Sequence, residues 1–258
     1  MILLGFDTAT PSTAVALRMP DGRSLHARHD PIPGEHPGHA TRLLGMANEL
    51  LGAAGIGWTG LDRIAVGLGP GTFTGLRVGI ATARGLAQSL ACELVGISTL
   101  RALAAPALAQ APGRVVLAVI DARRGEVFAG AYGEGAHGGP RELASPRALA
   151  PEDLGGVLAE AVAGGAPPGG WLAVGDGAVR YGNRLDALGV TVPPASSPLH
   201  AVSAESICEL GAMAAGADDR EILPDYRRRP DAELALQSAA AAAGPAAARA
   251  VSAGAGER

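Results

Sequence analysis

The sequence has few aromatic residues and contains no lysine. Phenylalanine, tyrosine and tryptophan account for 3% of the 258 residues, so a hydrophobic core must consist mainly of aliphatic side chains. The basic residues are all arginine, which we attribute to nucleotide composition rather than to function. The formal net charge of -4 argues against a free-standing nucleic-acid-binding protein, because phosphate contacts require clustered basic side chains. Any contact with RNA is therefore expected to be indirect.

Cysteine and long apolar segments are also scarce. The two cysteines, Cys92 and Cys208, lie far apart in apolar surroundings, a pattern that favours reduced, buried thiols over a disulfide. There is no uninterrupted run of about 18 apolar residues, and no basic leader precedes the first strand-like segment. We therefore expect a cytoplasmic protein that does not contact a membrane.

Residues 1–105 read as one α/β unit. Strand-like apolar segments alternate with two stretches in which leucine and alanine recur at helical spacing. The predicted strands are residues 2–7, 13–17, 23–29, 63–68 and 93–95, and the predicted helices are residues 37–52 and 72–90. A stretch rich in proline and alanine follows at residues 106–112 and separates this unit from the next.

Residues 106–230 loosely repeat the first unit. The predicted strands are residues 115–120, 126–132, 171–174 and 222–229, and the predicted helices are residues 151–163 and 203–215. Residues 231–258 form an alanine- and glycine-rich run without periodicity, which we expect to be a disordered tail, with an isolated helix as the alternative. Two such units resemble the duplicated actin-like ATPase fold (ASKHA, ribonuclease H-like), an α/β architecture with two lobes.

Two acidic turns mark the positions where that architecture would hold a nucleotide. Asp7 and Asp121 each end the first strand of a lobe, where carboxylates can hold a metal-phosphate complex. The turn after Asp7 either forms a phosphate loop or closes a hairpin through side-chain to backbone hydrogen bonds. Around Asp121 we favour a charged turn over a phosphate or acid-base site. The other candidates for a site that binds ATP or ADP weakly are Thr8, Thr10, Arg123, Gly175, Asp176 and Gly177.

The most distinctive motif is the string GPGTFTGLRVG at residues 69–79. Its glycines permit a sharp turn from strand to helix, and Thr72 or Thr74 can cap the helix and leave N–H groups available to an anion. Gly79, Ala81 and Ala83 keep parts of the helix surface thin. A thin helix either packs tightly on its own sheet or lets another chain approach, and the pattern by itself favours internal packing.

This string resembles the TsaB (YeaZ) family, and residues 39–44, 95–100, 121–128 and 224–230 also match it. The resemblance spans nearly all of residues 1–230. It implies a subunit of tRNA threonylcarbamoyladenosine biosynthesis that pairs through helices of its first lobe with its catalytic paralogue TsaD, or with itself when alone. The family also works with the ATPase TsaE and with TsaC, which makes the threonylcarbamoyl-adenylate intermediate. The partner-interface candidates are His39, Arg42, Leu43, Met46, Gly71, Thr72, Phe73, Thr74, Arg77, Val78, Gly79, Ala81, Thr82 and Ala83.

The sequence offers no metal-ligand set. TsaD carries a His-x-x-x-His pair after the strand that follows its glycine-rich helix, whereas residues 97–103 contain no histidine and no carboxylate. Pro37 and Gly38 interrupt the pair His36 and His39, which spoils helical spacing. We therefore expect a non-catalytic scaffold or activating partner of TsaD in the modification of adenosine 37 of tRNAs, without a metal or cofactor of its own. The alternative is an ATP-binding actin-like enzyme, a small-molecule kinase or a hydrolase, that uses Asp7 and Asp121.

Overall fold

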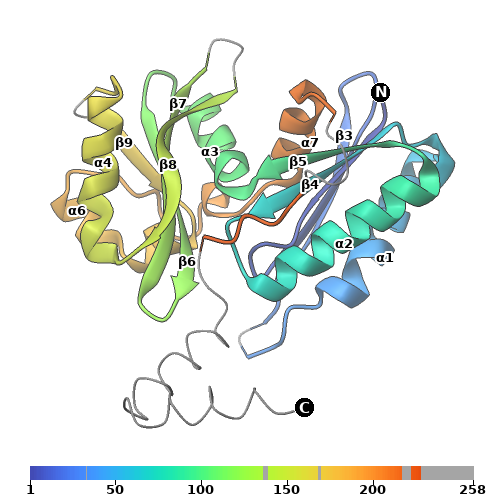
Figure 1. The fold of residues 1–258 in the computed structure, drawn as a ribbon, viewed down its shortest axis with the longest axis horizontal. Coiled ribbons are helices and arrows are strands. Elements are labelled where there is room, and N and C mark those ends of the chain that lie inside the picture. The colour runs from blue at the N-terminus through green and yellow to red at the C-terminus, as the bar shows by residue number, and fades with distance from the viewer. Residues whose placement is uncertain (33, 136–138, 168–169, 217–221, 228–258) are drawn as a thin grey trace, which may run out of the picture. The chain divides into compact units, whose positions relative to one another are not determined.

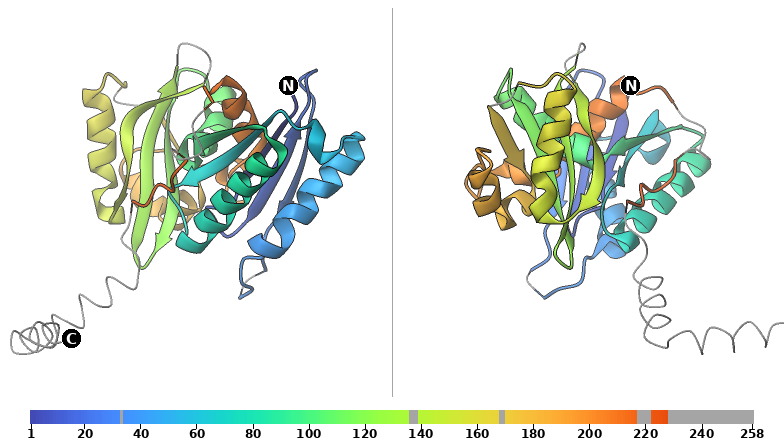
Figure 2. Two further views of the ribbon diagram at one scale, coloured as in Figure 1. Left: turned by 45° about the vertical axis from the view of Figure 1, so that its right-hand side comes forward. Right: turned by 60° about the vertical axis from the view of Figure 1, so that its left-hand side comes forward.

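The computed structural model describes residues 1–32, 34–135, 139–167, 170–216 and 222–227. Residues Met1–Arg227 form one compact unit that contains two β-sheets (Figures 1 and 2). The predicted tail, residues 231–258, lies outside the described residues.

The first sheet has the strand order β3-β2-β1-β4-β5. Its first three strands form an antiparallel meander, and β4 and β5 continue the sheet in parallel with β1. Leu4 and Phe6 point to the face covered by helices α1 and α2, whereas Leu3 points to the opposite face, as the period of two in a strand requires. The bounds are β1 Leu3–Asp7, β2 Thr13–Arg18, β3 Ser24–His29, α1 His39–Ala54, η1 Trp58–Gly60, β4 Arg63–Gly69, α2 Phe73–Leu90 and β5 Glu93–Ser98.

The second sheet has the strand order β8-β7-β6-β9, with an antiparallel meander of β6 to β8 and β9 parallel to β6. Val115, Leu117 and Val119 pack with residues of α4 and α6 on one face. The bounds are β6 Val115–Arg123, β7 Glu126–Glu134, β8 Pro140–Leu149, η2 Pro151–Asp153, α4 Leu154–Ala163, β9 Trp171–Val174, α5 Asp176–Arg180, α6 Gly182–Ala187 and η3 Pro198–His200.

Two helices, α3 (Thr99–Gln110) and α7 (Ala204–Met213), lie between the sheets (Figure 1). Leu103 of α3 and Ile207 of α7 belong to one buried cluster that includes Ala65 of the first sheet and Ala118 of the second. Each sheet thus begins with the same meander and parallel crossover, and each contributes one face to a shared core. The architecture confirms the predicted two-lobe α/β fold.

Four details differ from the sequence pattern. The pattern does not predict β8, an edge strand interrupted by Pro146, where proline is tolerated because the outer N–H groups have no partner strand. Helix α3 continues through Pro106, so the predicted boundary between residues 105 and 106 falls inside a helix, and the division into domains stays a prediction. Residues 175–178, whose Gly-Asp-Gly pattern predicts a turn, instead open the short helix α5. The predicted end strand is wrong for residues 222–227, which include Pro224, although the Asp225 N–H donates to the Leu68 carbonyl at 2.8 Å.

Candidate functional site

The carboxylate of Asp7 is enclosed by its own chain. Its Oδ1 accepts a hydrogen bond from the Ala9 N–H at 2.8 Å, and its Oδ2 accepts one from the Thr99 hydroxyl at 2.6 Å. The Thr99 oxygen in turn accepts a hydrogen bond from the Gly69 N–H at 3.1 Å. Asp7 is 1% exposed, and this burial raises its pKa despite the hydrogen bonds, which act in the opposite direction. Both carboxylate oxygens are therefore used inside the protein.

Close backbone packing holds this carboxylate in place. A β-carbon added to Gly67 of β4 would lie 1.9 Å from Oδ2 of Asp7, so only a glycine at this position leaves room for the acid. Thr8 is buried as well, and Thr10 is partly exposed. The Asp7 to Ala9 bond agrees with the interpretation that this turn closes a hairpin. A phosphate or metal at Asp7 would have to enter this enclosed site beside the two intramolecular hydrogen bonds.

The glycine-rich turn and helix α2 pack against the turn that follows β1. The Thr72 N–H donates to the Ala9 carbonyl at 2.7 Å, and the Thr8 hydroxyl donates to the Gly75 carbonyl at 2.7 Å. Three glycines face this turn, namely Gly71, Gly75 and Gly79. A β-carbon added to any of them would lie 2.0 to 2.3 Å from an atom of Thr8 or Ala9. The two predicted motifs thus form one packed unit, which agrees with internal packing as the reason for the thin helix.

Thr72 occupies the N-cap position of α2, in extended conformation, as the motif predicts. Its side chain makes no capping hydrogen bond to the helix. The N–H groups of the first turn of α2 are therefore not satisfied by this threonine.

The second acidic turn joins residues that are far apart in the sequence. The Asp121 N–H donates to Oδ1 of Asp176 at 2.9 Å, and Oδ2 of Asp121 accepts a hydrogen bond from Arg180 at 2.9 Å. The Arg123 N–H donates to Oδ1 of Asp121 at 2.9 Å. Desolvation of its carboxylate and the nearby charge of Asp121 raise the pKa of Asp176, although the residue as a whole keeps an exposed surface. These hydrogen bonds are typical of a charged turn. Arg180 takes part in them, although the sequence motifs did not indicate it.

Two glycines allow β6 and the start of α5 to approach each other. Gly175 has a φ of +109°, and a β-carbon there would lie 2.0 Å from the Val119 carbonyl oxygen. A β-carbon on Gly177 would lie 3.0 Å from the Asp121 nitrogen. Gly175 and Gly177, two of the nucleotide-site candidates, therefore lie against β6 next to Asp121, and this backbone packing explains why glycine is needed at both positions.

The partner-interface candidates divide between the inside and the outside of the first lobe. Helices α1 and α2 contact each other on the same face of the sheet (Figure 2). The buried candidates are His39, Leu43, Gly79 and Ala83. The exposed or partly exposed candidates are Arg42, Met46, Gly71, Thr72, Phe73, Thr74, Arg77, Val78, Ala81 and Thr82. Only the second group can meet another chain without displacement of the helices.

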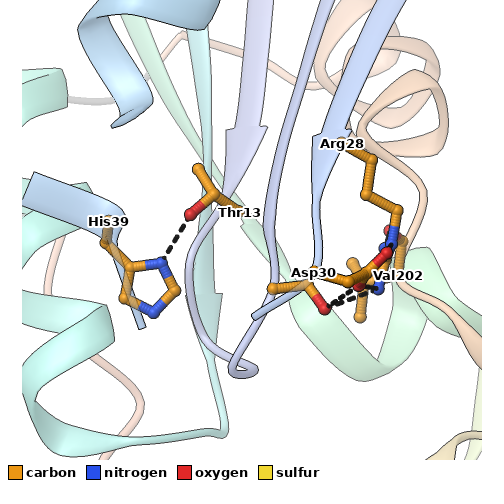
Figure 3. Close-up of polar contacts among 6 residues, drawn as sticks. Thr13, Arg28, Asp30, His39 and Val202 are labelled. Atoms are coloured by element: carbon orange, nitrogen blue, oxygen red, sulfur yellow. Dashed lines mark hydrogen bonds and ion pairs between the residues drawn. The ribbon is translucent and has the colours of Figure 1, made fainter. Parts of the chain in front are cut away.

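His39, at the start of α1, is 4% exposed and is bound to the sheet beneath it (Figure 3). Its Nδ1 lies 2.8 Å from the hydroxyl oxygen of Thr13 in β2, and its Nε2 has no hydrogen-bond partner among the described residues. Burial lowers its pKa, with a further contribution from His29. Nearby, Arg28 connects Asp30 to the Val202 carbonyl, which it meets at 3.0 Å. His39 therefore has a local structural role.

An aromatic and cationic cluster that the sequence reasoning missed lies beside the first turn of α2. The Arg77 guanidinium lies 3.7 Å from the centroid of the Phe73 ring, and its Nε donates to the Tyr226 hydroxyl at 3.0 Å. The rings of Phe73 and Tyr226 are 5.2 Å apart. The spacing of four residues between Phe73 and Arg77 was the available signal, whereas Tyr226 joins them only through the fold.

Within the described part of the chain, no group of three or more histidine, cysteine, aspartate or glutamate residues is placed to hold a metal ion. The described helices also include none with the length and apolar character needed to cross a bilayer.

The duplicated meander-and-crossover topology, with an acidic residue near the end of each first strand, defines an α/β protein of the actin-like fold. Residues 34–145 match the family model described as "TsaD: tRNA N6-adenosine threonylcarbamoyltransferase". The solved structure of YeaZ from Pseudomonas aeruginosa is 33% identical, with a TM-score of 0.71, and the match covers 87% of this chain and 99% of that one. The chain belongs to the TsaB (YeaZ) family.

Relatives of known sequence extend this result. An uncharacterized protein of Mycobacterium tuberculosis is 32% identical over 232 residues, which is 90% of this chain and 93% of the relative. The tRNA threonylcarbamoyladenosine biosynthesis protein TsaB of Escherichia coli is 40% identical over 132 residues, which is 51% of this chain and 55% of the relative. The chain thus matches about half the length of the TsaB proteins of E. coli and Haemophilus influenzae.

Proposed function

We propose that this chain takes part in threonylcarbamoyladenosine formation at adenosine 37 of tRNAs, as a non-catalytic scaffold and activating partner of TsaD. Membership in the TsaB (YeaZ) family carries the proposal, because relatives at 30 to 40% identity are named for this pathway. In this proposal TsaC and TsaE supply the intermediate and the ATPase activity of the same system, and tRNA contacts the chain only indirectly. The chain itself works in the cytoplasm without a cofactor.

The enclosure of Asp7 supports a non-catalytic role. A carboxylate that assists phosphoryl transfer must face a metal-nucleotide complex, and it needs oxygens that are free to do so. Here one oxygen accepts from Ala9 and the other from Thr99, at 2.8 and 2.6 Å. Asp121 is likewise engaged with Arg180 and Arg123. The likeness to TsaD then reflects a shared fold rather than a shared reaction.

The outward face of α1 and α2 is the surface that we propose for the partner. Leu44 is a large apolar residue that is 48% exposed on α1, and Arg42 of the same helix is also exposed. On α2 the exposed residues include Thr74, Arg77 and Ala81. Small side chains between longer ones allow the close approach of a second helix. The same surface would join two copies of this chain when TsaD is absent.

Reconstitution with TsaD tests the proposal. The purified chain is mixed with TsaD, TsaC, TsaE, ATP, threonine, bicarbonate and unmodified tRNA, and threonylcarbamoyladenosine is measured with and without the chain. We expect modification to depend on the chain. Equal modification in its absence would contradict an activating role.

A matched pair of variants tests the surface. Ala81→Arg places a long side chain on the exposed face of α2, and Ala109→Arg places the same side chain on an exposed position of α3. We expect Ala81→Arg to weaken association with TsaD at least tenfold, about 1.4 kcal/mol, with no loss of thermal stability. Ala109→Arg should bind as the unaltered chain does. Equal affinities for the two variants would exclude the α1 and α2 surface.

The alternative, an ATP-binding kinase or hydrolase that uses Asp7 and Asp121, makes a different prediction. It requires saturable binding of MgATP to the isolated chain, measured by calorimetry, and loss of that binding in Asp121→Asn. If both hold and the isolated chain also consumes ATP, the non-catalytic role is wrong.

A further inference from the structure

A cavity of about 260 Å³ opens where the start of α3 meets the β7–β8 hairpin. Figure 1 shows α3 beside these strands, on the side of the molecule away from α1 and α2. The residues that line the cavity are Ser98, Arg101, Tyr132, Pro140, Arg141 and Glu142. None of them belongs to the acidic turns or to the proposed partner surface, so the function proposed above does not use this cavity.

A buried phenol lines the cavity. Tyr132 of β7 is 1% exposed, and its hydroxyl has no hydrogen-bond partner among the described residues. Burial raises the pKa of Tyr132 strongly, and the nearby Ser98 side chain, which favours the ionised phenol, opposes this rise only in part. Proteins seldom bury a hydroxyl without a partner, and each such group calls for an explanation. A ligand in the adjoining cavity would supply one.

The charges around the cavity favour an anion. Arg101 and Arg141 both line it, and neither forms an ion pair with a described residue. Arg101 is held in place, because its Nε donates to the Pro140 carbonyl at 3.0 Å. Glu142 also lines the cavity, but its Oε1 accepts a hydrogen bond from the Ser145 hydroxyl at 2.6 Å. The lining therefore contains two guanidinium groups, of Arg101 and Arg141, and one carboxylate, of Glu142.

Two further features affect the balance of charge around the cavity. The cavity lies at the N-terminus of the twelve-residue helix α3, the end at which a helix dipole favours negative charge. The Asp225 carboxylate lies within electrostatic range of Tyr132, but it forms an ion pair with Arg227 at 2.5 Å. The summed charge of the groups around the cavity therefore remains positive.

We propose that this cavity binds a small molecule through a carboxylate or phosphate group, which pairs with Arg101 and Arg141 and accepts a hydrogen bond from the Tyr132 hydroxyl. Guanidinium groups suit both oxyanions, because their planar N–H donors match two oxygens at once. The cavity is larger than a phosphate ion, so the remainder of the ligand would lie along Pro140.

Calorimetric titration of the full chain tests the proposal, with inorganic phosphate and acetate as separate probes and sodium chloride used to hold ionic strength constant. We expect saturable binding of at least one probe. Affinity should fall at least tenfold in Arg141→Gln and severalfold in Tyr132→Phe. Arg23→Gln removes one exposed charge far from the cavity and should bind as the unaltered chain does. Circular dichroism checks that each variant is folded, which is expected because Arg141 is exposed and Tyr132→Phe keeps the buried ring.

The two probes separate the possible sources of the oxyanion. Binding of phosphate alone supports a phosphate-bearing ligand, binding of acetate alone supports a carboxylate, and competition between them supports a site for either. The proposal is overturned if neither probe saturates, or if Arg141→Gln and Tyr132→Phe bind with the affinity of the unaltered chain.

Discussion

Replacement of Gly75 by alanine should destabilise the protein, because this glycine meets the backbone of another segment. A β-carbon there would lie 2.0 Å from the Thr8 carbonyl oxygen and 2.6 Å from the Thr72 hydroxyl. The turn after β1 would have to move, and the hydrogen bond from the Thr8 hydroxyl to the Gly75 carbonyl would be strained. Overpacking of this kind costs about 1 to 3 kcal/mol and a lost hydrogen bond about 0.5 to 1.5 kcal/mol. Alanine returns at most about 1 kcal/mol of helix propensity.

The net expectation is a loss of roughly 1 to 3 kcal/mol in the free energy of unfolding, which urea titration followed by circular dichroism can measure. In a chain of this length the loss corresponds to a fall in melting temperature of roughly 2 to 10 °C. Gly85→Ala is the matched control, since Gly85 lies in the same helix and a β-carbon there would meet no atom within 4 Å. It should gain about 0.5 to 1 kcal/mol from helix propensity alone.

The test is that the two substitutions change the free energy of unfolding in opposite directions. If Gly75→Ala is as stable as the unaltered chain, or if both variants shift stability in the same direction, then the turn and the helix are not packed as described. The explanation of the glycine motif by intramolecular contact would then fail.

Three further predictions concern buried polar groups. Thr99→Val should cost about 1 to 3 kcal/mol, because it leaves an oxygen of the buried Asp7 carboxylate without its donor, whereas Thr99→Ser, which keeps the hydroxyl, should retain most of the stability measured in urea. Since burial lowers the pKa of His39, the unfolded chain takes up the proton first as pH falls below the ordinary value of 6.5, so stability should be lost below that pH. His39→Gln should weaken this dependence and His36→Gln, at an exposed position, should preserve it; equal pH profiles for all three proteins would refute the role of His39. Burial raises the pKa of the Cys208 thiol to about 12, so Cys208 should react with a thiol reagent at pH 8 only after unfolding, and rapid labelling of the folded Cys92→Ala variant would contradict this.

The strands and long helices were predictable because their signals are local. Helix α1 buries Leu43, Ala47 and Leu51 at spacings of four residues, and this period alone locates it within two residues of its observed bounds. Helix α3 lacked such a signal, because alanine dominates residues 102–109 and Pro106 resembles a boundary. What forms this helix is its burial between two sheets, which no short window of sequence contains.

The sequence could predict which segments form the candidate site, but it could not predict which residues contact one another there. Asp7 and the glycine-rich turn could be found as motifs, but the donor that satisfies Asp7 is Thr99, which is 92 residues away in the sequence. Thr99 lies in residues 97–103, where the sequence shows a family match over residues 95–100 and the lack of histidine, but no link to Asp7. The structure gives that stretch a positive role, since the Thr99 hydroxyl donates to the buried Asp7 carboxylate.

The glycines of the family motif and the residues of the proposed partner surface have different surroundings in the first lobe. Gly75 and Gly79 are spaced by four residues and therefore lie on one side of α2, and Gly71 precedes the helix; each of the three contacts the turn after β1. A surface formed by Thr74, Arg77 and Ala81 lies on other sides of the helix and remains exposed. Substitution of one of these glycines should therefore lower the stability of the fold, and it should affect association with a partner only through that loss of stability. An effect on a partner at unchanged stability can arise only from the exposed positions, so the two properties of this helix can be altered independently.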